Sequence, residues 1–252
     1  MQHDLVLRAD DVALVPLGFG HAPALLALVD DGLWAGLATP QPVSTTDMER
    51  LVLTAWETPG RYAFAVVDAA TGQVRGATSL HEVDRGHRRG TIGHTFYGRA
   101  WWGGSTNPAA KLALLTLAFD EWGLHRVGLR VDPRNTRSVA AIRRLGAVEE
   151  GLLRGYRATA DGMADSLSFS ILATEWPQVR AGLVRRLAGG VLTTSAGYAD
   201  APPSPAEVVA AAGVLTASAA AALDDAADAA GSAHGQAQVR GEGGRKAQEL
   251  LL

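Results

Sequence analysis

The bulky aromatic side chains of this chain are confined to its first part. All six tryptophans precede residue 180, and no Phe, Trp or Tyr follows Tyr198 in a chain of 252 residues. A hydrophobic core needs such side chains, because each of them removes a large apolar area from water. We therefore expect one folded domain over residues 1–188, and the 47% of hydrophobic residues in the chain is sufficient to build its core.

The remaining residues, 189–252, are rich in Ala, Gly and Pro and poor in side chains that a core could bury. Such a segment has little to offset the entropy lost on ordering it, so we expect a disordered tail. A second interpretation stays open, because residues 205–230 carry scattered Val and Leu among alanines and could form a helix with Ser204 as its N-cap. A binding partner could select that helix.

Charge and cysteine content exclude several kinds of protein. The chain has 23 Lys plus Arg against 26 Asp plus Glu, a net charge of -3, which argues against a surface for nucleic acid. Without cysteine there is no disulfide, no thiolate-bound metal and no cysteinyl acyl-enzyme, and we expect no metal cofactor. No apolar run has the length of a signal peptide or a membrane span, so we expect a cytoplasmic protein without a membrane partner. Whether two copies form a homodimer stays open.

The pattern of apolar residues and turn signals predicts an α+β fold. A first strand and two helices come before three successive strands, and helices then alternate with strands. Strands in a run followed by alternation indicate one sheet of mixed direction. The expected strands are 5–7, 62–67, 74–81, 90–97, 125–131, 147–153 and 166–172, and the expected helices are 25–33, one between 46 and 59, 107–122 and 135–145.

A glycine-containing loop at 101–106 connects an expected strand to an expected helix. Unpaired backbone N–H groups and the positive end of the helix dipole can hold phosphate there, and Gly103 and Gly104 allow a close approach. The alternative is that the loop only connects the strand to the helix, because a Gly-Gly pair is also common in such connections. The spacing excludes a Walker A loop, because Lys111 lies well inside the helix, and it excludes a Rossmann loop as well.

A second element begins at Asn135 and leads into a helix that ends at Leu145-Gly146-Ala147. By local chemistry Asn135 is a good N-cap and Ser138 is a residue of the first helical turn. The order of elements gives this pair a further meaning: a strand, a phosphate-type loop, a helix, a strand, and then a helix that opens with Asn-x-x-Ser.

In this order and in four segments the chain resembles the GCN5-related N-acetyltransferases (GNAT), in particular their branch of ribosomal-protein N-terminal alanine acetyltransferases. The resemblance covers about residues 5–187. It implies a central, largely antiparallel mixed sheet with splayed strands between flanking helices, and acetyl-CoA as the cosubstrate. The segments that carry it are Thr91-Ile92-Gly93-His94-Thr95-Phe96-Tyr97, Asn107-Pro108-Ala109-Ala110-Lys111-Leu112, residues 124–151, and Phe169-Ser170-Ile171-Leu172 with Glu175-Trp176-Pro177.

The resemblance also implies where acetyl-CoA would bind. The splayed strands would admit the pantetheine arm, next to Phe96 and Tyr97, and Asn135 would reach that arm or steady the loop. Ser105 stands where the family usually has glycine and Asn107 where it usually has Gly or Ala, although this branch often has Asn at the last place; backbone amides need no particular side chain. The pyrophosphate loop of the family falls on Trp102, Gly103, Gly104, Ser105, Thr106 and Asn107.

Acetyl transfer to an amine requires a neutral nucleophile, a polarised carbonyl and a proton for the departing thiolate. Many GNAT members supply that proton from a tyrosine, and here Ile142 stands in its place. The resemblance implies Ser138 as the proton donor instead, although first-turn capping would equally explain this serine. His94 is the candidate base and Glu82 the reserve; each has an ordinary packing or surface role as its alternative.

The expected reaction is transfer of acetyl from acetyl-CoA to a primary amine. Because an α-amine has a pKa near 8 and a lysine near 10.4, an enzyme with a weak base is better matched to peptide N-termini or amino-acid-like small molecules. The alternative is a GNAT-fold binding or scaffold protein with little turnover, whose C-terminal tail docks a partner.

Overall fold

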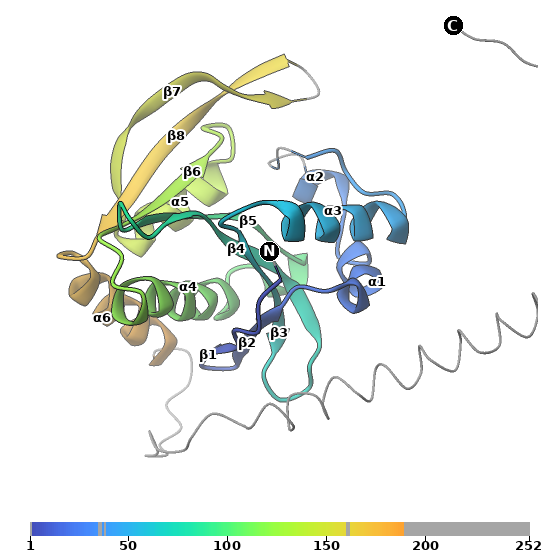
Figure 1. Ribbon diagram of the computed structural model, residues 1–252, viewed down its shortest axis with the longest axis horizontal. Coiled ribbons are helices and arrows are strands. Elements are labelled where there is room, and N and C mark those ends of the chain that lie inside the picture. Colours follow the sequence, from blue (N-terminus) through green and yellow to red (C-terminus); the bar gives the residue numbers. More distant parts are fainter. Residues whose placement is uncertain (1, 35–36, 38, 160–161, 189–252) are drawn as a thin grey trace, which may run out of the picture. The chain divides into compact units, whose positions relative to one another are not determined.

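The computed structural model describes residues 2–34, 37, 39–159 and 162–188. The expected tail, 189–252, and the helix expected over 205–230 lie outside the described residues. The described part confirms the α+β class, with one mixed, mostly antiparallel sheet flanked by helices (Figure 1).

The sheet has eight strands in the order β1-β2-β3-β4-β5-β6-β8-β7. Neighbouring strands are antiparallel except for β5 and β6, which run parallel. The strands are β1 Leu7–Ala9, β2 Val12–Pro16, β3 Tyr62–Asp68, β4 Val74–Asp84, β5 Arg89–Tyr97, β6 Arg126–Val131, β7 Val148–Thr159 and β8 Gly162–Leu172.

The helices cover both faces of this sheet. They are α1 Ala22–Leu26, α2 Asp31–Trp34, α3 Thr45–Glu57, α4 Thr106–Thr116, α5 Thr136–Leu145 and α6 Trp176–Ala188. A π-helical turn, Leu117–Glu121, extends α4, and short 3₁₀ helices lie at Phe19–His21 and Arg99–Trp101.

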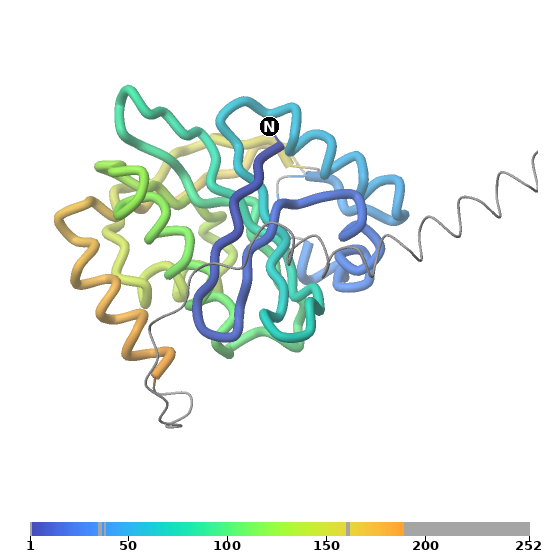
Figure 2. Tube along the Cα trace, turned by 60° about the horizontal axis from the view of Figure 1, so that its bottom comes forward, coloured from blue at the N-terminus to red at the C-terminus, as the bar shows by residue number. Residues whose placement is uncertain are grey.

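Two apolar clusters pack on opposite faces of the sheet. One joins side chains of α4, α5 and α6 to β2 and β3, with Leu114, Leu183 and Phe64 among its buried members. The other joins α1, α2 and α3 to the opposite face of the same strands, with Leu25 and Val52 at its centre. Figure 2 shows α4 and α6 side by side, away from the layer of α1 to α3. Neighbouring strand residues point to opposite faces, so in β2 the side chains of Val12 and Leu14 join the first cluster and that of Ala13 joins the second.

The expected strands and helices were confirmed with three exceptions. The first strand is a hairpin of β1 and β2. The helix expected over 25–33 is two short helices, because the Asp30 carboxylate accepts a hydrogen bond from the Leu33 N–H (2.9 Å) and starts a new turn. Helix α6 was not among the expected elements.

The feature that positions the site is the separation of β5 from β6. Their parallel pairing runs only from Arg89 opposite Arg126 to Ile92 opposite Leu129. Beyond this point β5 continues through residues 93–97 with no pairing to β6. A β-bulge lies in the same stretch, where the register of β4 and β5 shifts and His94 takes a φ of 49°. The sheet therefore opens at its centre.

Candidate functional site

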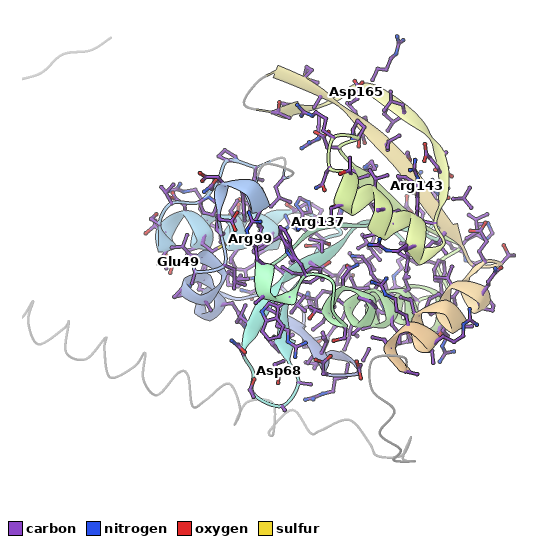
Figure 3. The ribbon with its side chains drawn as sticks, turned by 180° about the vertical axis from the view of Figure 1, so that it is seen from behind. Glu49, Asp68, Arg99, Arg137, Arg143 and Asp165 are labelled. Carbon is purple, nitrogen blue, oxygen red and sulfur yellow. The ribbon has the colours of Figure 1, made fainter. Side chains whose placement is uncertain are left out.

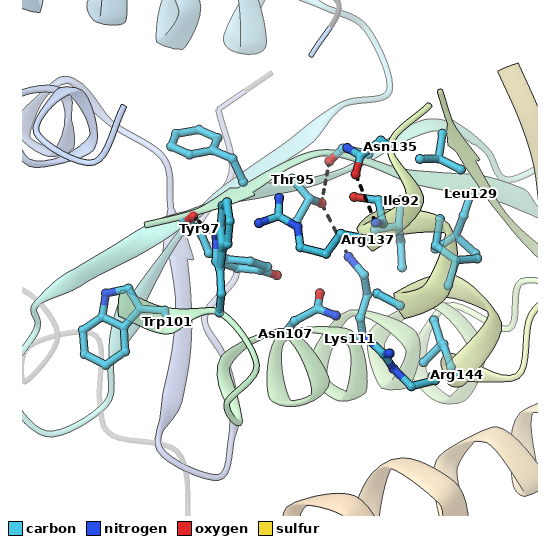
Figure 4. A pocket seen from close by; sticks show the side chains of 18 of the residues that line it. Ile92, Thr95, Tyr97, Trp101, Asn107, Lys111, Leu129, Asn135, Arg137 and Arg144 are labelled. Atoms are coloured by element: carbon cyan, nitrogen blue, oxygen red, sulfur yellow. Dashed lines mark hydrogen bonds between the residues drawn. The ribbon is translucent and has the colours of Figure 1, made fainter. Parts of the chain in front are cut away.

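A pocket of about 250 Å³ lies where β5 and β6 separate (Figure 4). Its walls are β5, the end of β6, the loop before α4, the first turns of α4, and α5. Most of the residues proposed from the sequence meet in this pocket. The expected site residues that line it are His94, Phe96, Tyr97, Trp102, Gly103, Gly104, Asn107, Asn135 and Ser138.

The loop before α4 presents unused backbone donors. Among the described residues, none accepts a hydrogen bond from the backbone N–H groups of residues 103–107. Gly103 has a φ of 79°, a conformation that favours glycine. Helix α4 has no side-chain cap at Ser105, so its first-turn N–H groups and its dipole are available to an anion. The local geometry is that of a phosphate-binding helix start.

Two of the expected loop residues turn their side chains away from the pocket. The Ser105 hydroxyl donates to Oδ1 of Asp11 at 3.0 Å. The Thr106 hydroxyl is buried and accepts a hydrogen bond of 3.2 Å from the Arg75 guanidinium. These two residues can reach a ligand in the pocket only through their backbone amides.

Arg75 holds the loop in place. Its side chain is 3% exposed, and its guanidinium is paired with Asp68 and, at 2.8 Å, with Asp11. The same guanidinium lies 4.4 Å from the centre of the Trp101 ring. A buried charge paired on several sides in this way fixes the geometry around it, since loss of one partner would leave the other uncompensated. The start of α4 is thus tied to β3, β4 and the β1–β2 turn.

Positive charge gathers around the pocket. Arg99 and Arg137 lie close together (Figure 3), with their guanidinium carbons 4.8 Å and 3.2 Å from the centre of the Trp102 ring. No Asp or Glu is among the residues lining the pocket. This surrounding suits an anionic ligand. Sequence analysis missed it, because these cations come from three separate elements, β6, α5 and α6: Arg130, Arg137, Arg144 and Arg186.

The Tyr97 hydroxyl is buried at the pocket and has no hydrogen-bond partner among the described residues. Burial raises the pKa of this hydroxyl above its usual value. It therefore keeps its proton and can donate to a polar group of a ligand, which would remove the cost of an unsatisfied buried group.

Asn135 and Ser138 are joined at the start of α5. The Asn135 side-chain oxygen accepts a hydrogen bond of 3.1 Å from the backbone N–H of Ser138, so Asn135 is the N-cap. Only the side-chain NH₂ of Asn135 is left for a ligand. The Ser138 hydroxyl has no partner among the described residues and faces the same pocket, as does Ile142. The cap thus holds Ser138 in position without using its hydroxyl.

His94 lies between this pocket and a second cavity of about 260 Å³ on the α1–α3 side of the sheet. Trp34, Met48 and Arg61 line that second cavity. The bulge in β5 places His94 where both cavities reach it, and the residue is exposed there. Partial desolvation by the neighbouring protein, together with the positive charge of Arg61, lowers the pKa of His94 below its usual value. The imidazole is neutral near pH 7.

His81 stands next to His94, with the ring centres 4.9 Å apart in an edge-on arrangement. Burial lowers the pKa of His81 to about 4. Gly93 suits this place, because a Cβ at this position would lie 2.5 Å from Nε2 of His81, so that the His81 ring would have to move.

Glu82, the reserve base, does not line the pocket. It accepts a hydrogen bond from the Thr91 hydroxyl (3.0 Å), is paired with Arg130, and lies 3.8 Å from Nδ1 of His81. Burial opposes its ionisation, but the hydrogen bonds from Arg130 and Thr91 outweigh this and lower the pKa of Glu82. Only the His81 ring connects this carboxylate to His94.

Sequence analysis also missed Lys111, which it treated only as a helix residue. The side chain is 6% exposed, lines the pocket, and places Nζ 3.5 Å from the Thr95 hydroxyl. Burial lowers the pKa of Lys111 to about 8. The sequence held one signal, since Lys111 is the only lysine in residues 1–188.

Two other kinds of site were sought in the described part of the chain. There, no three side chains of His, Asp or Glu gather as metal ligands would. Among the same residues, no helix has both the length and the apolar character needed to cross a membrane.

Comparison with protein families gives one match over most of the described chain. A model described as an acetyltransferase (GNAT) domain matches residues 11–148. The match begins at Asp11 and ends at the start of β7. It includes the loop before α4 and the whole of helix α5.

Individual relatives agree with the family model. Among curated proteins, an uncharacterized N-acetyltransferase of Bacillus licheniformis, p20, is 30% identical over 113 residues, which are 45% of this chain and 63% of p20. YdaF of Bacillus subtilis (strain 168), provisionally named a ribosomal N-acetyltransferase, is 32% identical over 105 residues, 42% of this chain and 57% of YdaF. The matched segments thus span less than two thirds of either relative.

Among solved structures, Mycobacterium smegmatis RimJ in complex with CoA-disulfide is similar to this chain, with a TM-score of 0.64 and 25% identity. The comparison covers 74% of this chain and 94% of that protein. The fold described above is therefore shared over nearly the whole length of that structure.

Proposed function

The chain belongs to the GNAT acetyltransferase family, and from that premise we propose that it moves the acetyl group of acetyl-CoA directly to a primary amine. One observation carries the proposal: the backbone N–H groups of residues 103–107 have no acceptor among the described residues, and three residues of this loop, Gly103, Gly104 and Asn107, line a pocket opened by the separation of β5 and β6. The loop suits the diphosphate of acetyl-CoA, and the pocket suits the flexible arm that carries its thioester.

Each part of acetyl-CoA has a counterpart in the pocket. The diphosphate binds at the start of α4, where the helix dipole and the surrounding arginines favour negative charge. The pantetheine arm lies between β5 and β6. Its amide groups accept hydrogen bonds from the unpartnered Tyr97 hydroxyl and from the free NH₂ of Asn135. Phe96 and Trp102 supply apolar contact.

The reaction needs no covalent enzyme intermediate. The neutral amine attacks the thioester carbon, while a backbone N–H of residues 93–97, which β6 does not use, stabilises the negative charge on the oxygen. A C–N bond forms, the C–S bond breaks, and the thiolate takes the proton of the Ser138 hydroxyl, which a proton from solvent replaces. Ser138 suits this role because its hydroxyl is unpaired and its backbone is fixed by the Asn135 cap.

His94 receives the proton of the attacking amine. Its low pKa makes it a weak base, but the nitrogen becomes a much stronger acid once it is bonded to the carbonyl carbon, so a weak base at the right place is sufficient. The amine must arrive neutral. This requirement favours an α-amine, with a pKa near 8, over a lysine side chain near 10.4.

We propose a peptide or protein N-terminus, or an amino-acid-like small molecule, as the acceptor. The second cavity supports this, because it reaches His94 from the opposite side of the sheet and is lined largely by apolar side chains. YdaF is provisionally named for a ribosomal acceptor, which makes a ribosomal-protein N-terminus the first acceptor to assay.

Acetyl-CoA binding is tested by thermal unfolding of the purified protein with and without the cosubstrate. Binding to the native state alone at 100 times Kd stabilises it by about 2.7 kcal/mol, which raises the unfolding midpoint by several degrees. Pantetheine, which lacks the diphosphate, serves as the control and is expected to give a smaller shift. An unchanged midpoint at saturating acetyl-CoA would remove the proposal.

A second candidate is a GNAT-fold binding or scaffold protein with little turnover. The observation that favours it is Ile142, which lines the pocket where many relatives have a proton-donating tyrosine. Acetyl-CoA would then bind without being consumed in the presence of amines and N-terminal peptides. An assay of CoA release over such a panel separates the two candidates.

A further inference from the structure

Lys111 is an amine enclosed in the proposed acetyl-CoA pocket. It extends from α4 and approaches Thr95 of β5, with 3.5 Å between Nζ and the threonine hydroxyl (Figure 4). Its side chain is 94% buried, since only 6% is exposed. The chain has 23 Lys plus Arg, and Lys111 and Lys246 are the only lysines among them. A lysine therefore stands here in a protein that uses arginine almost everywhere else.

No negative charge balances this amine. Among the described residues Lys111 forms no ion pair, and the charged and titratable side chains around the pocket are neutral or positive. Burial lowers the pKa of Lys111 to about 8, so a substantial neutral fraction exists near pH 7.5. Besides Tyr97, those side chains are His94 from β5, Arg130 from β6, Arg137 and Arg144 from α5, and Arg186 from α6.

We propose that Lys111 is a self-acetylation site, which takes the acetyl group of bound acetyl-CoA when no acceptor amine is present. The inference rests on the proposed function, which places the thioester beside β5. Nζ attacks the thioester carbon, a C–N bond forms and the C–S bond breaks. The thiolate leaves with the proton that the nitrogen loses, so that CoA and acetyl-Lys111 are the products.

The product changes the pocket in two ways. The amide of acetyl-Lys111 carries no charge, and the acetyl group fills space in a pocket of about 250 Å³ that the thioester end of a second acetyl-CoA would need. Turnover should therefore fall as acetylation proceeds. An arginine at this position could not react, because its guanidinium stays protonated.

The test incubates the full-length protein with acetyl-CoA in the absence of any acceptor amine. We expect a gain of one acetyl group in intact-mass spectra, located at Lys111 by peptide mapping. The initial rate should rise with pH through about 8. It should exceed the rate on the denatured chain about 100-fold or more, because the folded pocket holds the two reacting groups together. Pre-incubated protein should lose turnover in step with the acetylated fraction.

Two variants and a binding measurement make the result decisive. Lys246→Arg should acetylate as the parent does, and Lys111→Arg should gain no acetyl group in the same time. If Lys111 stays unmodified while acetyl-CoA raises the unfolding midpoint, the self-acetylation proposal is wrong and the proposed function stands. If acetylation occurs only at the rate of the denatured chain, the proposal is equally overturned. If the midpoint also stays unchanged, the proposed function itself fails.

Discussion

The Ser138 hydroxyl lies in a position suited to catalysis and forms no hydrogen bond with the described residues. Its backbone N–H, not its hydroxyl, binds Asn135. Ser138→Ala therefore leaves the cap of α5 intact while removing the proton that the leaving thiolate takes. We expect kcat to fall about 100-fold, within the usual range for loss of a general acid, with acetyl-CoA affinity changed less than about 3-fold.

Steady-state kinetics and equilibrium binding of acetyl-CoA measure these two effects separately. Asn135→Ala is the matched comparison, because it removes the cap instead and should lower the free energy of unfolding by about 1 kcal/mol. Unchanged kcat in Ser138→Ala would return this serine to an ordinary place in the first turn.

The buried His81 links the stability of the protein to pH. The pKa of His81 is about 4 in the folded state, against 6.5 in the unfolded chain. Between these values the unfolded state binds more protons, so the free energy of unfolding falls as the pH drops from 6.5 towards 4. Because the side chain is only 14% exposed, little solvent screening reduces this effect.

The variant His81→Gln should flatten this dependence. We expect the slope of unfolding free energy against pH to drop by up to about 1.4 kcal/mol per pH unit over that window. Urea denaturation at a series of pH values gives the slope, and measurements above pH 7, where the imidazole is neutral in both states, give the baseline. Parallel curves for the two proteins below pH 6 would show that this ring does not titrate as described.

At the scale of elements, the start of α4 is the feature on which acetyl-CoA binding depends. Gly104 tests it without disturbing the fold, because a Cβ there would meet no atom within 4 Å and its φ is not in the left-handed range. Gly104→Ala should change the free energy of unfolding by less than about 1 kcal/mol. The added methyl group would crowd a diphosphate held against the backbone, so we expect about 10-fold weaker acetyl-CoA binding, or 1.4 kcal/mol.

Gly20→Ala is the control for Gly104→Ala. Gly20 also has open space around its Cβ position and no left-handed φ, but it lies outside the pocket. Calorimetric titration with acetyl-CoA should separate the two variants. Equal affinities for both would mean that the ligand does not touch the loop before α4.

Most elements could be predicted from local signals. Ser44 and Asn135 are N-caps as their residue types indicate, and Gly146 ends α5 in the left-handed conformation. The β1–β2 hairpin was missed because β1 has only three residues and gives too short an alternation. The broken helix after residue 26 was missed because the Asp30 carboxylate that restarts the chain is held by Arg99, 69 residues away in sequence.

Several features of the pocket could not be predicted from local sequence patterns. Glycines before a helix and an Asn-x-x-Ser pair could be recognised, so the loop and α5 were found. The bulge at His94, the turn of Ser105 towards Asp11 and the burial of Lys111 depend on contacts between distant elements. No spacing in the sequence reports such contacts, and the partners of Glu82, which are Thr91, Arg130 and His81, could not be predicted from it for the same reason.

In the whole molecule, two cavities on opposite faces of one sheet meet at His94. The central strands β5 and β6 separate there after only four paired residues, and one apolar cluster packs on each face of the sheet. Acetyl-CoA from one side and an amine from the other would then meet without passing each other. This arrangement favours a mechanism in which both substrates are bound before transfer.

Every described residue that lines either cavity lies between Leu17 and Arg186, upstream of residues 189–252. A stop after Ala188 should therefore change the free energy of unfolding by less than about 0.5 kcal/mol, as substitutions away from structural features do. It should leave kcat for an N-terminal peptide unchanged. Turnover that survives this truncation argues for an enzyme whose chemistry is complete within residues 2–188. A folded, inactive truncation that still binds acetyl-CoA would instead give the tail a role in the acceptor site and favour the binding-protein alternative.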